Sequence, residues 1–464
     1  MNVEQMRDDN RLDITLTEFR EFVGQHSWRK MGSWERENFG TIFFDASKSI
    51  ARYAKFGITV APPAVLRIGN DGYICENAIS KYVDFHLVKL RDKNYSYYDG
   101  IRAKQQEMLQ DLVQKTSEFK ARCDFKSFLD FFEIMATLHV LFDFDRSLSD
   151  AIEIELAKVR CEIGDNNLAS EYVWENEHES QAVDLVRKLR EVKLRAVNGE
   201  PFRNDLILLA EKFGHLGFYQ FRGRAFSPDD LEEMMNNVLP RTTMPKSTKN
   251  KTPVDDRFGA ISQLAGRFSA HRLQRVEAAN SALYLLRNSL AEFFNSRGVT
   301  AFMHLVYPQV KPAANGLLES TGLRAHEKTV IYVSSLRVYR LNLEEVDEFK
   351  GEFSVDLKQS VLRGTRASAG ICKGRARIVL DPSGCKDFCE GDVLVCSMTD
   401  PNFLPLMLKA GAFVTEKGGI LCHAAILARE LQKPCLIGVK GLLVSVIDGN
   451  IVEVDCNSEI LTVL

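Results

Sequence analysis

The stretch TEKGGILCHAAILARELQKPCLIGV, which runs from Thr415 to Val439, decides how the end of this chain is interpreted. It holds a Gly-Gly bend, then His423, then the helix-forming residues 424–431. Pro434 ends the helix, and the apolar residues 435–439 predict a short strand. His423 is therefore expected in the first turn of a helix, beside backbone N–H groups without an intrahelical partner. Because a helix start favours anions, an imidazole at this position is suited to accept a phosphoryl group.

For an isolated histidine, a buried side chain beside an ordinary turn is the alternative. The whole string favours the functional interpretation, because it closely resembles the phosphohistidine swivelling domain of the phosphoenolpyruvate-utilising enzymes. The shared pattern is T-E-x-G-G-x-x-[SC]-H-A-A-I-x-A-R-E, followed by a proline and a glycine. Upstream, Gly391–Val395 and Thr399–Pro401 resemble the G-D-I-L-V strand and the T-D-P turn of that domain. Downstream, residues 448–455 resemble its closing hairpin.

The resemblance implies that His423 is the phosphorylated residue. Six neighbours are expected to orient the imidazole or the phosphoryl group: Thr415, Glu416, Gly418, Gly419, Cys422 and Arg429. Thr415 and Glu416 precede the helix and are expected to hydrogen-bond the imidazole. Arg429 lies nearly two turns further along and is expected to anchor the helix. No residue is assigned to a metal.

A second group of residues lies between Lys212 and Arg224, where three glycines interrupt a helix. The ordinary alternative is a helix C-cap followed by a polar turn. The segment also resembles, less tightly, a motif of the substrate domain of rifampicin phosphotransferase, although Leu216 replaces an arginine of that motif. We therefore expect His215 to be a catalytic residue at the acceptor site. The expected acceptor-binding residues are Tyr219, Arg222 and Arg224, because a guanidinium binds phosphoryl oxygens in pairs.

Composition indicates a globular protein of two or three domains, since the chain has 464 residues, 45% of them hydrophobic and 27% charged. A net charge of −3 gives no indication of nucleic acid or an anionic membrane as partner. The N-terminus does not have the pattern of a signal peptide. The ten cysteines form no CxxC pair, so we expect no disulfide framework, no zinc and a cytoplasmic protein.

The patterns along the chain predict an α+β multidomain fold. Residues 1–363 are expected to form a mostly α-helical region that binds a substrate or partner, and residues 364–464 a small α/β swivelling phosphohistidine domain. A hinge is expected at Gly364–Gly370. Within the helical region we predict a hairpin around Asn70–Asp71 and a mobile linker at about 240–256. A long helix over 263–295 and a last helical stretch over 336–349 complete this region.

The resulting hypothesis is a phosphotransferase component that carries a phosphoryl group on His423 to a small-molecule acceptor. Neither GxxxxGK[ST] nor GxGxxG occurs in the chain. The nucleotide-binding (ATP-grasp) part is therefore expected on a separate chain, with ATP, or alternatively phosphoenolpyruvate, as the original donor and Mg²⁺ at that donor site. The alternative is a non-catalytic phosphohistidine regulator or relay that binds a partner protein.

Overall fold

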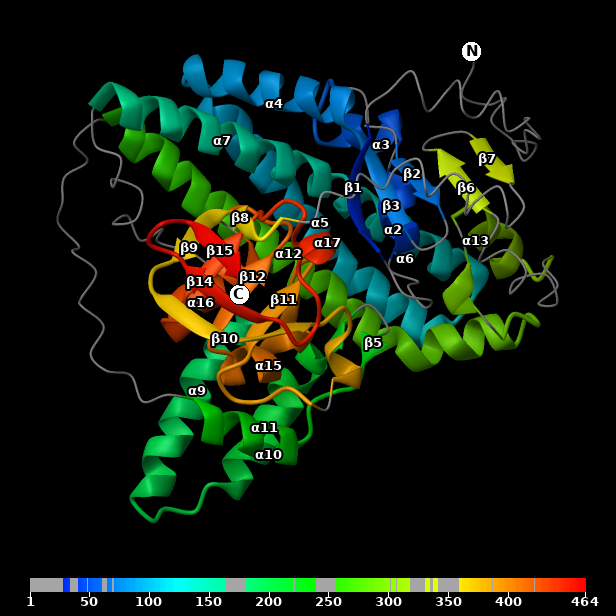
Figure 1. The fold of residues 1–464 in the computed structure, drawn as a ribbon. Coiled ribbons are helices and arrows are strands. Elements are labelled where there is room, and N and C mark those ends of the chain that lie inside the picture. The colour runs from blue at the N-terminus through cyan, green and yellow to red at the C-terminus, as the bar shows by residue number, and fades with distance from the viewer. Residues whose placement is uncertain are drawn as a thin grey trace. The chain divides into compact units, whose positions relative to one another are not determined.

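A computed structural model describes residues 28–33, 41–47, 49–60, 65–68, 71–163, 180–219, 222–238, 256–300, 302–305, 307–317, 330–333, 337–340, 359–385, 387–420 and 422–464. The chain divides into two compact units, and Figure 1 labels helices and strands that form them. The first combines residues 1–151 with 281–355, and the second combines residues 152–280 with 356–464. Each unit therefore contains two separate stretches of the chain.

The first unit contains helices and one antiparallel sheet. Its helices are α2 (Thr41–Ser47), α3 (Ile50–Lys55), α4 (Glu76–Arg91), α5 (Tyr95–Arg122), α6 (Phe125–Leu138), the start of α7 (Leu141–Ile163), the end of α12 (Asp256–Asn295), η3 (Phe302–His304) and α13 (Tyr307–Ala314). The sheet has the order β1 (Trp28–Ser33), β3 (Asp71–Cys75), β2 (Val65–Ile68), β6 (Val330–Val333), β7 (Arg337–Arg340). Stacked and edge-on phenylalanine rings join the helices, with Phe128 and Phe293 centroids 4.9 Å apart.

Several predictions for this unit can be compared with its elements. The hairpin around Asn70–Asp71 is confirmed by the antiparallel pairing of β2 with β3. The long helix is confirmed as α12, which begins seven residues earlier than predicted, at Asp256. The prediction of helix over 336–349 is wrong at Arg337–Arg340, which form strand β7 against β6. Residues 341–349, the rest of that predicted helix, lie outside the described residues. The same holds for residues 240–255 of the predicted linker.

The helical part of the second unit consists of the end of α7, α9 (Gln181–Val197), α10 (Arg203–Phe213), η2 (Gly214–Gly217), α11 (Pro228–Asn237) and the start of α12. Between η2 and α11, the short strands β4 (Phe218–Tyr219) and β5 (Arg222–Gly223) pair with each other. Helix α11 starts with a capping box, in which the Ser227 hydroxyl accepts from the Asp230 N–H and the Asp230 carboxylate accepts from the Ser227 N–H. The predicted α+β arrangement is confirmed: helices precede a C-terminal sheet.

The C-terminal part of the second unit is an eight-stranded sheet. Its order is β8 (Val361–Arg363), β15 (Ile460–Val463), β14 (Ile451–Asp455), β10 (Ile371–Ile378), β11 (Val393–Cys396), β12 (Ala412–Thr415), β13 (Cys435–Ile437), β9 (Thr365–Ser368). The helical elements are η6 (Pro382–Gly384), η7 (Pro401–Phe403), α15 (Leu404–Lys409), α16 (His423–Leu431) and α17 (Leu442–Ser445). Strands β10 to β13 are parallel, and their neighbours on either side are antiparallel.

The start of this sheet corrects the predicted hinge. Strand β8 begins at Val361, three residues before the predicted boundary at residue 364. Strands β8 and β9 on either side of Gly364 pair with β15 and β13 of the same sheet. A hinge at Gly364–Gly370 would therefore break strand pairing inside the domain, and that prediction is wrong.

The central strands are buried on both faces, which explains why β11, β12 and β13 are continuous apolar runs. One face packs against α15 and α16 and, beyond them, against α9, α10 and α11 in a single hydrophobic cluster. The other face packs against α17 and the outer strands. The sheet therefore holds α16, the helix that starts with His423, between itself and the helical part of its own unit.

Candidate functional site

Two residues meet at one edge of the sheet, where parallel strands end. Thr399 follows β11, and His423 follows β12 at the first residue of α16. Because β11 and β12 are parallel neighbours, with Cys396 beside Thr415, the loops after them leave from the same edge. The Thr399 hydroxyl lies 2.9 Å from Nδ1 of His423. This hydrogen bond fixes the orientation of the imidazole.

The other nitrogen of His423 is the reactive candidate. Among the described residues, Nε2 has no hydrogen-bond partner and is buried. Burial lowers the pKa of His423 to about 4, because the charged imidazolium would lose its hydration. The ring is therefore neutral near pH 7. When Nδ1–H donates to Thr399, Nε2 carries the free lone pair that a nucleophile needs.

The loop before His423 is built around a glycine. Gly418 has a φ of +123°, and a Cβ there would lie 2.9 Å from Sγ of Cys422. Cys422 is the N-cap residue of α16 and donates its N–H to the carbonyl of Gly419 at 2.9 Å. Burial raises the pKa of the Cys422 thiol, so it is not a competing nucleophile at neutral pH. Gly418, Gly419 and Cys422 thus set the position of the helix start.

The other predicted orienting residues make different contacts from those expected. Thr415 donates its hydroxyl to the carbonyl of Lys417 at 2.8 Å, and the Glu416 carboxylate accepts from the Leu443 N–H at 3.4 Å. In the part of the chain that the structure describes, Thr399 is the residue that bonds the imidazole. The prediction that Thr415 and Glu416 hydrogen-bond the imidazole is therefore corrected. Both residues shape the loop instead.

Arg429 anchors this loop to its own helix. Its guanidinium Nη1 donates to the carbonyl of Ile420 at 3.1 Å, one residue after the Gly-Gly bend. Burial lowers the pKa of Arg429, but a guanidinium keeps its charge at neutral pH. Arg429 thus has the predicted anchoring role, but it acts through a hydrogen bond to a backbone carbonyl and not through the expected ion pair.

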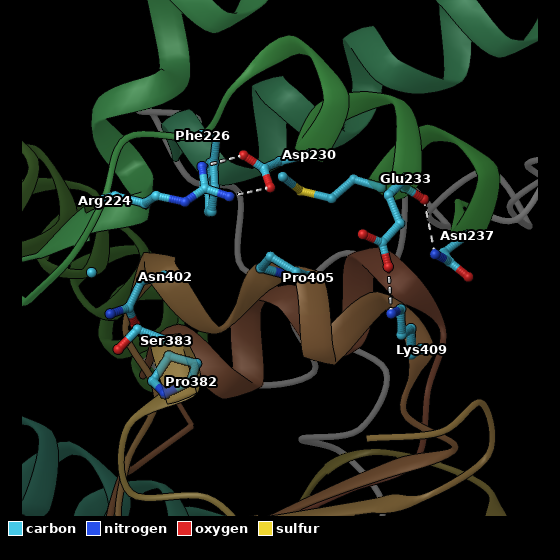
Figure 2. Close-up of a pocket in the computed structure, with 13 residues that line it drawn as sticks. Arg224, Phe226, Asp230, Glu233, Asn237, Pro382, Ser383, Asn402, Pro405 and Lys409 are labelled. Atoms are coloured by element: carbon cyan, nitrogen blue, oxygen red, sulfur yellow. Dashed lines mark hydrogen bonds and ion pairs between the residues drawn. The ribbon is translucent and has the colours of Figure 1, made fainter. Parts of the chain in front are cut away.

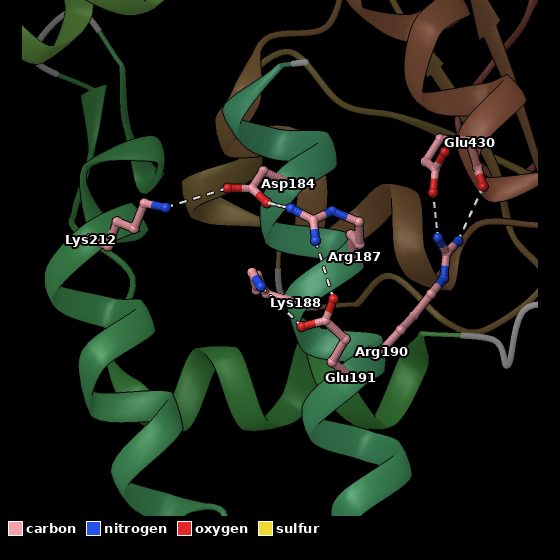
Figure 3. A network of polar contacts seen from close by, with 7 residues as sticks. All are labelled: Asp184, Arg187, Lys188, Arg190, Glu191, Lys212 and Glu430. Atoms are coloured by element: carbon pink, nitrogen blue, oxygen red, sulfur yellow. Dashed lines mark hydrogen bonds and ion pairs between the residues drawn. The ribbon is translucent and has the colours of Figure 1, made fainter.

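Helical residues of the same unit lie against the loop. The Glu153 carboxylate of α7 accepts from the Ile420 N–H at 3.3 Å. The positive charge of Arg272 on α12 acts on Cys422 and lowers its thiol pKa, against the larger effect of burial. Helix α9 contributes Arg190, whose guanidinium bonds the carboxylate of Glu430 and, at 3.1 Å, the Glu430 carbonyl (Figure 3). Both ends of α16 are therefore held by helical residues.

The second predicted group forms a compact hairpin beside the first. His215 lies in η2, which packs against η7, the turn of helix directly after Thr399 and Asp400. Burial lowers the pKa of His215, while the nearby Glu277 carboxylate opposes the shift. The Phe218 carbonyl accepts from the buried Asn280 amide at 2.8 Å. The His215 segment thus packs against the turn that directly follows Thr399, the residue bonded to His423.

The three predicted acceptor-binding residues have different surroundings. Tyr219 is half-buried at the end of β4 and is the cross-strand partner of Arg222, whose side chain is not described. Arg224 forms a bidentate ion pair with Asp230, with distances of 2.6 and 2.8 Å. Its guanidinium lies at the start of α11 and is committed to this carboxylate in the present conformation. These roles therefore stay predictions.

No three His, Cys, Asp or Glu side chains converge within the described ranges in a way that could hold a metal ion. No step at His423 is therefore assigned to a metal held by these residues alone. In the same residues, none of the helices combines the length and the apolar character needed to span a bilayer.

Comparison with known proteins agrees with the motif around His423. Residues 388–459 match the family model of the mobile domain of PEP-utilising enzymes. A probable phosphoenolpyruvate synthase of Staphylothermus marinus is 41% identical over 127 residues, which cover 26% of this chain and 15% of that protein. The phosphoenolpyruvate synthase of Helicobacter pylori is 38% identical over 24% of this chain and 14% of its own length. The uncharacterized phosphotransferase YvkC of Bacillus subtilis is 39% identical over 124 residues, which cover 26% of this chain and 15% of that protein.

The aligned part of this chain spans about 15% of the length of these relatives. The comparisons confirm the predicted family for the C-terminal segment and support a phosphohistidine phosphotransferase family. The resemblance of the helical region to rifampicin phosphotransferase stays a prediction. A solved structure of aconitase X from Thermococcus kodakaraensis covers 23% of this chain and 99% of its own at 19% identity, but its TM-score of 0.20 is too low to support an argument.

Proposed function

We propose that this chain is a phosphotransferase component in which Nε2 of His423 accepts a phosphoryl group and passes it to a small-molecule acceptor. The observation that carries the proposal is the geometry of the imidazole. Nδ1 is held by Thr399, whereas the neutral Nε2 has no hydrogen-bond partner among the described residues. Nε2 is thus available for a bond to phosphorus, and the match of the surrounding residues to the mobile domain of PEP-utilising enzymes supports this use.

In the first step, the Nε2 lone pair attacks the phosphorus of the donor, and the bond from phosphorus to the leaving oxygen breaks. That oxygen keeps the electron pair. Nδ1–H continues to donate to Thr399, so the phosphorylated ring retains its orientation. The positive end of the α16 dipole, at its first turn, favours the added negative charge. We assign the donor site, with ATP as the original donor and Mg²⁺, to a separate ATP-grasp protein.

In the second step, an oxygen of the acceptor attacks the phosphorus, and the P–N bond breaks. The electron pair returns to Nε2, and the acceptor proton must leave. His215 is proposed as the base, because burial lowers its pKa and keeps it neutral near pH 7. The packing of η2 against η7 supports this assignment, since it brings the His215 segment to the turn that directly follows Thr399, the residue bonded to His423.

Incorporation of phosphate into the chain tests this proposal. Incubated with its donor system, the wild-type chain should gain a phosphate that is labile in acid and stable in base. His423→Asn should not be labelled, while circular dichroism should show an unchanged fold. Full labelling of His423→Asn would overturn the proposal.

The His215→Ala variant tests the second step separately. It should be charged at the wild-type rate, whereas discharge to the acceptor should slow by roughly 10²–10⁴-fold, the usual contribution of a general base. Normal discharge would show that His215 is a structural residue of the hairpin. If the wild-type chain is charged but no small molecule discharges it, the relay function is favoured.

A further inference from the structure

A pocket of about 190 Å³ lies inside the second unit, and its lining includes Arg224 and Asn402 but neither His423 nor Thr399. One wall is the segment from Gly217 to Asn237, which includes α11. The other wall comes from η6, η7 and α15 of the C-terminal domain (Figure 2). Since drug-sized ligands occupy roughly 300–1,000 Å³, this pocket suits a smaller molecule.

Glycines on the helical side make the wall possible. A Cβ at Gly217 would lie 2.4 Å from the Arg224 carbonyl and 2.7 Å from the Phe226 ring. Gly223 has a φ of +72°, and a Cβ there would lie 2.4 Å from the Gly217 carbonyl. The backbone is therefore closely packed behind the pocket, with the ring of Phe226 lining it.

The charged groups in the pocket neutralise each other. Arg224 is paired with Asp230, and Lys409 of α15 is paired with Glu233 of α11 at 2.6 Å (Figure 2). A charged ligand would meet no unpaired group of opposite sign among these four side chains and would have to displace one partner of a partly exposed ion pair. The arrangement therefore favours a ligand without net charge.

One polar side chain at the pocket is left over. Asn402 is 4% exposed, and among the described residues neither its amide nitrogen nor its amide oxygen has a hydrogen-bond partner. The other two uncharged polar side chains have partners: Asn237 donates to the Glu233 carbonyl at 2.8 Å, and Ser383 donates to Asp381 at 2.6 Å. An unpaired buried carboxamide is costly, so the position is suited to a bound group that pairs with it.

We propose that this pocket binds a small, uncharged, planar molecule with an amide-type edge, in which a donor and an acceptor lie side by side. That edge pairs with both atoms of the Asn402 carboxamide. The ring of the ligand lies among the apolar side chains of Phe226, Met234 and Pro405. Because the two walls come from the helical segment and the C-terminal domain, the ligand holds these two parts of the second unit together.

Binding of nicotinamide to the full chain tests the site, with nicotinate as its charged counterpart on the same ring. Calorimetry should show binding of nicotinamide, and about tenfold weaker or no binding of nicotinate, because a carboxylate offers acceptors only. Hydrogen exchange should show that nicotinamide protects both α11 and residues 401–409. Equal binding of the two compounds, no binding of nicotinamide at its solubility limit, or protection of only one wall would overturn the proposal.

Two variants separate binding from folding. Asn402→Leu keeps the volume and removes the unpaired amide, so it should raise the melting temperature of the free chain and weaken nicotinamide binding about tenfold or more. Ser383→Phe at an exposed position should fill the pocket and abolish binding, whereas Ser383→Ala should bind as the wild type does. A fall in melting temperature for Asn402→Leu with unchanged binding would show that Asn402 is a structural residue.

Discussion

At the scale of single residues, the chemistry of His423 depends on which ring nitrogen is occupied. The Thr399 hydroxyl holds Nδ1, and in the proposed reaction the buried Nε2 is the atom that takes the phosphoryl group. The low pKa of about 4 keeps the ring neutral over the physiological range, so no proton has to leave Nε2 before attack. A hydroxyl partner suits this task because it accepts from Nδ1–H without adding a charge beside the phosphoryl group.

Thr399→Val removes the hydroxyl and keeps the shape of the side chain. The imidazole should then lose its preferred orientation, and charging of His423 should slow by roughly 2- to 10-fold, the equivalent of about 0.5–1.5 kcal/mol for one hydrogen bond. Rates of phosphate incorporation measure the effect. Thr399→Ser restores the hydroxyl and should restore the rate; equal rates for the valine and serine variants would show that the bond does not matter.

The local sequence predicts His423 at the start of a helix but does not predict its partner Thr399. The histidine is found because the bend, the helix start and the proline are consecutive, so local rules place it. Thr399 is 24 residues away and meets the imidazole only through the pairing of β11 with β12. A signal was available, because Thr399-Asp400-Pro401 follows an apolar strand that is the neighbour of β12. Thr415 was expected to bond the imidazole, but it is the last residue of β12 and donates its hydroxyl to the Lys417 carbonyl.

At the scale of elements, the loop between β12 and α16 determines where the histidine lies. Three contacts fix it: Cys422 N–H to the Gly419 carbonyl, Arg429 to the Ile420 carbonyl, and Glu153 to the Ile420 N–H. The contact with Glu153 comes from the helical part, so the loop is shaped both by its own domain and by α7. The positive φ of Gly418 is what lets the chain turn at this point.

Gly418→Ala tests the loop. An alanine at a φ of +123°, with its Cβ 2.9 Å from Sγ of Cys422, should destabilise the chain by about 1–3 kcal/mol and greatly reduce charging of His423. Chemical unfolding and phosphate incorporation measure the two effects. Gly384→Ala is the matched control, because a Cβ there meets nothing within 4 Å, and its free energy of unfolding should change by less than about 0.5 kcal/mol. Similar behaviour of the two variants would contradict the account.

The sequence predicts those elements whose residues lie close together along the chain. The hairpin of β2 and β3 and the helix α12 follow from turn residues and apolar spacing. The five-stranded sheet was not predicted, because β2 pairs with β6, which places Leu66 beside Val333 more than 260 residues later. No local pattern reports a pairing over that distance. For the same reason, the apolar spacing near Leu336 predicts a helix where β7 forms.

At the scale of the molecule, the second unit combines a helical segment with the C-terminal domain. Arg190 with Glu430 and Lys409 with Glu233 are ion pairs between these two parts, and Figure 3 shows the first within a wider network of charges on α9. We propose that this is the arrangement for transfer to the acceptor, because the His215 segment packs against η7, the turn that directly follows Thr399. Charging would then require a different arrangement, in which His423 meets the donor protein.

The purified chain alone should not turn over ATP. This expectation rests on the proposal that a separate ATP-grasp protein supplies the donor site. Release of AMP and inorganic phosphate from ATP measures the activity, before and after a candidate donor protein is added. Robust ATP hydrolysis by the chain alone, unchanged in His423→Asn, would show a nucleotide site in the chain itself.

The attachment point of the phosphoryl group tests the central claim most directly. After charging by the donor system, ³¹P nuclear magnetic resonance of the folded chain, with peptide mapping, identifies both the residue and the ring nitrogen. The account predicts a single phosphohistidine at His423, linked through Nε2, because Nδ1 is bonded to Thr399. A phosphoryl group on Nδ1 of His423, or on any other residue, would contradict it.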